Sequence, residues 1–207
     1  MYVPHRFRAT DLGAVRSFLE ANSFGILVNE VDGRPWGSHI PLELDRDAAG
    51  REVLYGHVAR ANPQSRSFAS GEPVLAIFSG PHGYVSSSAY QEPDVPTWNY
   101  IAVHVYGRVE LLEAAELLVS LRALLEKYEH GSARPVTFEG LPVRVQNLVN
   151  GIVGFKIVID EVQAAFKLSQ NRDAIDHAAV VADLERRDDA GALAVAAAMR
   201  ERGPAGQ

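Results

Sequence analysis

The chain has 207 residues, 47% of them apolar and 22% charged, and a formal net charge of −6; these values suit one globular domain with a substantial core and exclude a disordered or fibrous protein. It has no cysteine, which excludes disulfides, thiolate metal sites and cysteine nucleophiles. The sequence lacks both a run of about eighteen apolar residues and an apolar N-terminal signal region, so we expect a cytoplasmic protein that does not span a membrane.

The N-terminal part is predicted to form a short amphipathic helix and then a β-hairpin. Thr10 is expected to cap the helix, and apolar residues recur at helical spacing until Asn22. Strands are predicted at 24–31 and 36–44, on either side of a tight turn at Asp32-Gly33.

The central part is predicted to hold further strands and one short helix. Asn62-Pro63 has the pattern of a helix cap followed by proline in the first turn, and the helix should end near Ala69. The predicted strands of this part are 53–58, 74–78, 84–90 and 98–111.

The strand at 98–111 has two different faces. One face is apolar and is predicted to be core: Ile101, Val103, Val105, Val109 and Leu111. The other face carries aromatic groups and a histidine: Trp98, Tyr100, Ala102, His104, Tyr106 and Arg108. Because such a face would be unusual against bulk water, we expect it to meet a ligand or a second subunit.

The C-terminal part is predicted to contain mainly helices. Helices are expected at 114–128, 141–149, from a cap at Asn171 to Leu184, and at 191–199, with strands at 152–159 and 162–168 and a disordered tail at 203–207. The elements do not alternate as a parallel doubly wound sheet requires. We therefore predict a mainly β (α+β) fold, an antiparallel barrel with peripheral helices, in which residues 171–207 are a helical extension of a domain spanning 1–170.

Four segments combine polar side chains with turn or helix-start geometry. Segment 56–64 ends a strand and opens a helix, where free N–H groups favour a phosphate, although an ordinary strand-to-helix turn with a satisfied cap is the simpler explanation. Segment 80–90 gathers turn formers and hydroxyls, Ser86 among them, that suit a polar heterocycle or an exposed edge strand. Segment 167–172 has two cations and three neutral hydrogen-bonding side chains, which suit an anion or a solvated loop.

The fourth segment, 95–100, begins the strand with the two faces. Trp98 could pack on a flat ring while Asn99 hydrogen-bonds its edge, and core packing with a turn is the alternative. The seven histidines have no metal-ligand spacing, and the motifs of hydrolases, nucleoside triphosphatases and dinucleotide-binding proteins are missing.

Together these segments resemble the PaiB family of FMN-binding negative transcriptional regulators. The similarity extends to 102–107, 151–156, 124–129 and the first four residues, and covers the chain up to about Asn171. It implies a flavin-binding split β-barrel, related in fold to pyridoxamine-phosphate oxidases, that forms a homodimer and holds FMN near the subunit interface. The resemblance and the segments above together indicate these FMN contacts: His39 and Leu42 on the strand around Ser38, His57, Asn62 and Gln64 at the phosphate end, Ser86, Trp98, and Lys167, Gln170 and Asn171 from the C-terminal loop.

The resemblance implies a negative transcriptional regulator, and the alternative is an FMN-dependent oxidoreductase of the pyridoxamine-phosphate-oxidase-like superfamily. A dimer that has lost flavin and senses a small molecule is a third possibility. No catalytic residue is identified and no metal is expected. The acidic charge disfavours a broad DNA-binding surface, so we expect a regulator to act through its flavin or a regulatory partner.

Overall fold

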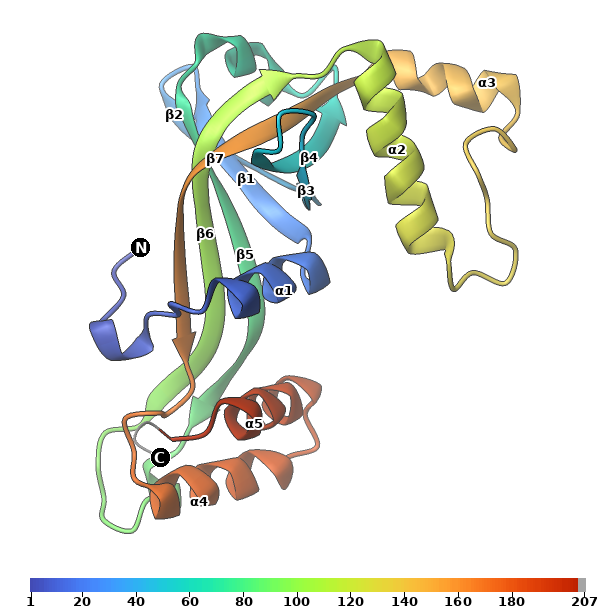
Figure 1. The fold of residues 1–207 in the computed structure, drawn as a ribbon. Helices are drawn as coiled ribbons and strands as arrows, with labels where there is room; N and C mark the ends of the chain where they lie inside the picture. The colour runs from blue at the N-terminus through green and yellow to red at the C-terminus, as the bar shows by residue number, and fades with distance from the viewer. Residues whose placement is uncertain (205–207) are drawn as a thin grey trace. The chain divides into compact units, whose positions relative to one another are not determined.

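The structure is a computed structural model that describes residues 1–204 (Figure 1). Within them, seven strands form one sheet in the order β2-β1-β5-β6-β7-β4-β3, with antiparallel pairing in every register determined. The strands are β1 (Phe24–Val31), β2 (Arg34–Pro41), β3 (Glu43–Arg46), β4 (Glu52–Ala59), β5 (Pro73–Val85), β6 (Thr97–Leu111) and β7 (Ile152–Lys167). The α-helices are α1 (Leu12–Ala21), α2 (Ala114–Glu129), α3 (Val143–Gln146), α4 (Ala174–Glu185) and α5 (Ala190–Arg202), and the 3-10 helices are η1 (His5–Phe7), η2 (Pro63–Ser70), η3 (Ser87–Ala89) and η4 (Asn147–Gly151).

The chain divides into two compact units, and the three long strands β5, β6 and β7 contribute residues to both. Unit 1 comprises Met1–Phe18, Phe78–His104 and Gln163–Gln207, and unit 2 comprises Leu19–Ile77 and Val105–Val162. The sequence-based boundary at residue 170 stays a prediction. Of the predicted disordered tail, 205–207 lie outside the described residues. Among the described helices, none is both long and apolar enough to cross a membrane.

Unit 2 is a strongly curved part of the sheet around an apolar core. The hairpin forms as predicted: β1 has the expected bounds, and Asp32 and Gly33 both adopt positive φ in the turn. Strand β2 contacts β4 although the two are not hydrogen-bonded neighbours, so the sheet curls without closing, as in a split barrel. The core side chains with no exposed surface include Leu27, Leu42, Val53, Leu54, Phe155 and Ile157.

Strand β2 lies at one end of the strand order, so one of its sides has no partner strand among the described residues. Just beyond the end of β2, Leu42 N donates to Ser23 O at 2.8 Å. Because hydrogen-bonded positions alternate along an antiparallel pair, the even-numbered residues of β2 are those whose backbone groups face β1. The odd-numbered residues face outward, and two of them, Pro35 and Pro41, have no N–H group.

Unit 1 is built from the remaining parts of the long strands and the C-terminal helices. Helices α4 and α5 pack on each other (Figure 1). Their inner faces bury Val180, Val181, Leu184, Val195 and Met199. A Cβ at Gly83 of β5 would lie 3.6 Å from Val195 and 3.9 Å from Leu184, so the end of this strand packs directly on the helix pair.

One predicted break in a strand is wrong because its glycine serves close packing. The segments 74–78 and 84–90 were expected as separate strands, but β5 runs unbroken to Val85 and Ser87–Ala89 is a 3-10 helix. At Gly80 a Cβ would lie 2.5 Å from the Phe18 ring and 3.1 Å from Ile101, so glycine permits the approach of side chains rather than making a turn.

A second predicted break is wrong because polar residues lie in an exposed part of a strand, and one real break was not predicted. Strands 152–159 and 162–168 are one strand, β7, whose central residues Asp160 and Glu161 are exposed. The predicted strand 36–44 is interrupted at Leu42, between β2 and β3.

Two predicted helix caps are also wrong. Asp11, not Thr10, caps α1, because its carboxylate accepts from the N–H groups of Gly13 and Ala14 at 2.9 and 3.2 Å. Asp173, not Asn171, caps α4 and accepts from Asp176 N at 2.8 Å. Helices at 114–128 and 191–199 are confirmed, and 141–149 holds the two short helices α3 and η4.

The two faces of β6 are confirmed near its centre. Ile101, Val103 and Val105 are buried, and the alternating residues from Tyr100 to Tyr106 are half-buried. Leu111 at the end of the strand is 50% exposed, so the apolar face is not core along its whole length.

Candidate functional site

The predicted site residues fall into one group in each unit. The unit 2 group lies on β2, between β2 and β3, on β4 and at the start of η2: His39, Leu42, His57, Asn62 and Gln64. The unit 1 group lies on or beside β5, β6 and β7: Ser86, Trp98, Lys167, Gln170 and Asn171.

Asn62 joins η2 to β2 with both ends of its side chain. Its Oδ1 accepts from Gln64 N at 3.0 Å, which confirms the predicted cap, and its Nδ2 donates to Ser38 Oγ at 2.9 Å. The amide is only half-buried. Asn62 therefore fixes the geometry of the helix start and presents part of its surface to solvent.

Two acceptors near η2 have no hydrogen-bond partner among the described residues. Gln64 has no exposed surface and donates from Nε2 to Leu27 O at 3.0 Å, while its Oε1 is unpartnered. Asn29 donates to Ser67 Oγ at 2.7 Å, and its Oδ1 is likewise unpartnered. Each such buried unsatisfied group costs about 1–3 kcal/mol, and neither oxygen has surface open to a ligand.

The remaining unit 2 residues differ in their exposure. His57 is half-buried on β4, and burial lowers its pKa, so the ring is neutral at pH 7. His39 is exposed on the edge strand and stacks on Phe24 with 6.2 Å between ring centroids. Leu42 is fully buried and packs toward Gly56, so it shapes the site from within.

In unit 1, Trp98 forms an exposed aromatic cluster with His82 and Tyr84. It is 49% exposed, its ring lies 6.0 Å from that of His82 in a stacked arrangement, and Nε1 donates to His82 Nδ1 at 3.3 Å. The Tyr84 ring meets it edge-on at 6.1 Å. Ser86 caps η3 by accepting from Ser88 N at 3.2 Å.

The C-terminal loop places its predicted residues in three environments. Lys167 Nζ donates to Trp98 O at 2.6 Å and to Thr97 Oγ1, and burial, reinforced by the nearby charges of Arg172 and Arg6, lowers its pKa. Gln170 is buried and uses its amide on the backbone of Leu168 and Phe166. Asn171 is exposed. Gln170 therefore holds the loop, while Lys167 and Asn171 keep groups available to a ligand.

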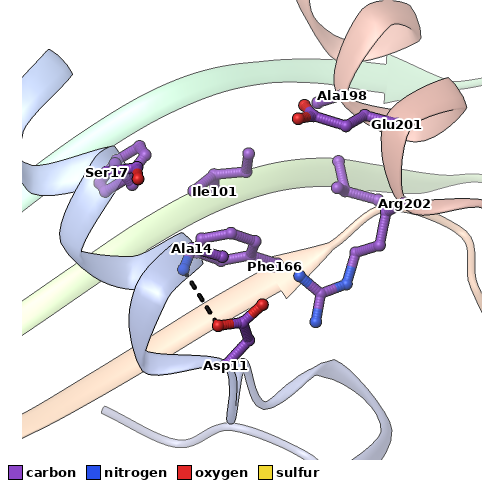
Figure 2. Close-up of a pocket in the computed structure, with 10 residues that line it drawn as sticks. Asp11, Ala14, Ser17, Ile101, Phe166, Ala198, Glu201 and Arg202 are labelled. Carbon is purple, nitrogen blue, oxygen red and sulfur yellow. Dashed lines mark hydrogen bonds between the residues drawn. The ribbon is translucent and has the colours of Figure 1, made fainter.

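Unit 1 also has a hollow of about 650 Å³ whose lining contains none of the predicted site residues (Figure 2). Figure 2 shows Arg202 extending from α5 toward Asp11 at the start of α1, with its guanidinium 5.0 Å from the centroid of Phe166. The hollow is lined by segments far apart in the chain, so no sequence motif indicates it. Among residues 1–204 no group of His, Asp or Glu side chains is arranged to hold a metal ion.

Comparison with known proteins identifies the family. Residues 1–161 match the family described as "Putative FMN-binding domain". The chain belongs to this FMN-binding family. It is 41% identical over 203 residues to "Protease synthase and sporulation protein PAI 2" of Bacillus subtilis, covering 98% of each chain. The PaiB resemblance predicted from the sequence is thereby confirmed.

Solved structures confirm the predicted fold. The flavocytochrome Anf3 of Azotobacter vinelandii superposes with a TM-score of 0.60 and 20% identity, over 78% of this chain and 70% of that one. The FAD and heme binding protein of Mycobacterium smegmatis gives a TM-score of 0.58 and 17% identity, over 83% and 78% of the two chains. The fold is the split β-barrel that these flavin-binding proteins share, and the family to which the chain belongs is described as FMN-binding.

Each group, taken by itself, has residues whose chemistry suits part of such a cofactor. In unit 2, the half-buried side chain of Asn62 at the start of η2 suits a polar group of a flavin nucleotide. The exposed face of Trp98 suits a flat ring, and the Lys167 ammonium suits a phosphate or an electron-rich ring edge.

Proposed function

We propose that this protein is an FMN-binding negative transcriptional regulator of the PaiB type that works as a homodimer in the cytoplasm. The observation that carries the proposal is the 41% identity over 98% of both chains to a protein named "Protease synthase and sporulation protein PAI 2". The match to the FMN-binding family supplies the cofactor.

In this proposal both groups of predicted residues bind FMN. His57, Asn62 and Gln64 serve the phosphate end, with Asn62 as the exposed contact and the buried Gln64 as its support. In unit 2, His39 on β2 and Leu42 just after it are proposed as further contacts. In unit 1, Trp98 and Ser86 are proposed to contact the ring, and Lys167, Gln170 and Asn171 are proposed as contacts from the C-terminal loop. Bound FMN would supply a group that can be reduced and reoxidised.

The charge of the chain favours regulation through the flavin or a partner protein. At −6 it lacks the excess of Lys and Arg that supplies most non-specific DNA affinity. The half-buried aromatic face of β6 supports a dimer, because such a face is stabilised when a second subunit covers it. Residues 171–207 would then be a helical addition to the flavin-binding part, 1–170.

The cofactor is tested on the purified protein by its absorption spectrum and by FMN titration. We expect flavin absorbance, or uptake of one FMN per chain, and weaker FMN retention in Asn62→Ala and Lys167→Ala with folding retained. Unchanged affinity in both variants would show that the proposed contacts are misplaced. A protein that takes up no FMN would overturn the proposed cofactor.

Regulation is tested separately with a promoter reporter in a deletion strain. Restored repression by the wild type, and its loss in an FMN-free variant, is the expected result. Rapid oxidation of a nicotinamide cofactor by the loaded protein, without any effect on transcription, would favour the oxidoreductase alternative. Light scattering checks the dimer, and a monomer at micromolar concentration would contradict it.

A further inference from the structure

A small basic hollow in unit 1 lies at the C-terminal loop. Its volume is about 190 Å³, and its walls include Arg6, Lys167 and Arg172, with Thr97 and Asn171 beside them. This volume holds a phosphate-sized group, whereas a whole flavin nucleotide needs a pocket several hundred Å³ in volume. The hollow therefore suits the anionic end of a small molecule.

The cations around the hollow outnumber the carboxylates that neutralise them. Arg172 pairs with Asp94 at 2.6 Å and lies over the Tyr90 ring, 4.0 Å from its centroid. Arg6 has neither an ion pair nor a hydrogen bond among residues 1–204 and lies 5.2 Å from the Phe7 ring centroid. After burial, the like charges of Arg172 and Arg6 also lower the pKa of Lys167.

The same Phe7 ring attracts Lys167, whose Nζ lies 5.7 Å from its centroid. Three cations against one carboxylate leave a net charge of +2 around the hollow. Because like charges gathered this closely repel one another, an oxyanion that enters the hollow relieves the repulsion.

The floor of the hollow is polar and rigidly held. Asn99 has no exposed surface and Ser169 only 3%. Asn99 Nδ2 donates to Ser169 Oγ at 2.9 Å, and Ser169 adopts φ 59°, an unfavourable value for a residue with a side chain. Strained residues over-determined by their surroundings are concentrated at ligand sites.

We propose that this hollow binds the phosphate group of a small molecule other than FMN, in a position where Lys167 serves both ligands. The shared role of Lys167 rests on the proposed function, which makes Lys167 an FMN contact. The anion site itself rests only on the residues of unit 1 that line the hollow. A dianion matches the net charge, and the free guanidinium of Arg6 offers the paired donors that a phosphate group prefers.

Inorganic phosphate is the probe, titrated into the FMN-loaded protein and into the protein without FMN, with phosphorus NMR line width as the readout. We expect saturable binding in both forms that weakens about tenfold in Arg6→Gln, since a hydrogen bond to a charged group is lost. Arg8→Gln is the matched control, because Arg8 is also exposed, is two residues away and does not line the hollow. Its phosphate affinity should stay unchanged, and FMN affinity should stay unchanged in both variants.

Three results would overturn the proposal: no saturable phosphate binding, equal effects of the two arginine substitutions, or displacement of phosphate by FMN. Acetate should bind more weakly than phosphate, and equal affinities would contradict the preference for a dianion. If phosphate binds in an Arg6-dependent manner but FMN does not bind, the anion site stands and the proposed function fails.

Discussion

The side-chain amide of Asn99 on β6 holds the hydroxyl of Ser169 at 2.9 Å, with both residues buried in unit 1. The contact fixes the turn that follows β7, where Ser169 has a positive φ. This turn positions Lys167, Gln170 and Asn171.

Substitution of Ser169 should reveal the strain in this turn. Ser169→Ala and Ser169→Gly both lose the hydroxyl, but glycine adopts a positive φ without the steric cost of a Cβ. We expect Ser169→Gly to be more stable than Ser169→Ala by about 1 kcal/mol, measured by urea unfolding. Alanine equal to or better than glycine would show that the turn relaxes.

Asn62→Ala should weaken unit 2 by removing the cap of η2 and the bond to Ser38. Loss of a helix cap costs about 1 kcal/mol, and FMN affinity should fall as well. Asn62→Asp is the control, because it keeps the capping oxygen and loses only the Nδ2 donor. It should recover most of the stability, and equal destabilisation by both changes would contradict the assigned capping role.

Gly107→Ala should disrupt the pairing of β6 with β7. A Cβ at this position would lie 2.2 Å from the carbonyl oxygen of Val158, and a backbone atom cannot turn aside as a flexible side chain does. We expect a loss of at least about 2 kcal/mol, as for other overpacked sites. Gly151→Ala is the control, since its Cβ would meet nothing within 4 Å, and its thermal midpoint should stay near that of the wild type.

The stability of unit 2 should decrease in acid because of one arginine. Arg51 bonds Asp47 at 2.8 Å and both oxygens of Glu110 at 3.0 and 2.9 Å, and these bonds lower the pKa of each carboxyl below its ordinary value of 3.8 or 4.5. A carboxylate whose pKa is lowered by folding stabilises the protein above its unfolded pKa, and this contribution is lost as the pH falls through the folded value.

Urea unfolding at pH 7, 4.5 and 3.5 tests this contribution. The free energy of unfolding of the wild type should decline as the pH falls below about 4.5, the ordinary value for glutamate. Arg51→Met should be less stable at pH 7 and should decline less steeply. Parallel pH curves for the two proteins would show that the arginine contributes no pH-dependent stability.

Local chemistry decided which parts of the fold could be predicted. The hairpin and the cap at Asn62 follow from residues adjacent in the chain, and both are confirmed. The breaks predicted in β5 and β7 were wrong because glycine and acidic residues occur both in turns and in strands. Glycine is also found where a strand packs closely, and acidic residues where a strand is exposed. For Gly80, the Phe18 ring that folding brings beside it shows that this glycine serves packing in a strand and does not make a turn.

The candidate sites show the same limit. Lys167 and Arg172 could be assigned to an anion site because they share one loop. Arg6 could not be assigned to that site from the sequence. It lies beside Lys167 and Arg172 only because the N-terminal segment pairs with β7 through the bridge between Arg8 and Ala165. The hollow beside Arg202 likewise draws on the two ends of the chain.

The two prolines of β2 also affect how the protein can assemble. Pro35 and Pro41 lack the N–H that a further strand would need on the outward side, so an added strand could pair only over the short stretch between them. Such interruptions protect natural sheets from uncontrolled edge-to-edge aggregation. The outward side of β2 is therefore a poor template for a further strand, and a contact between chains at this edge would depend on side chains rather than on backbone pairing.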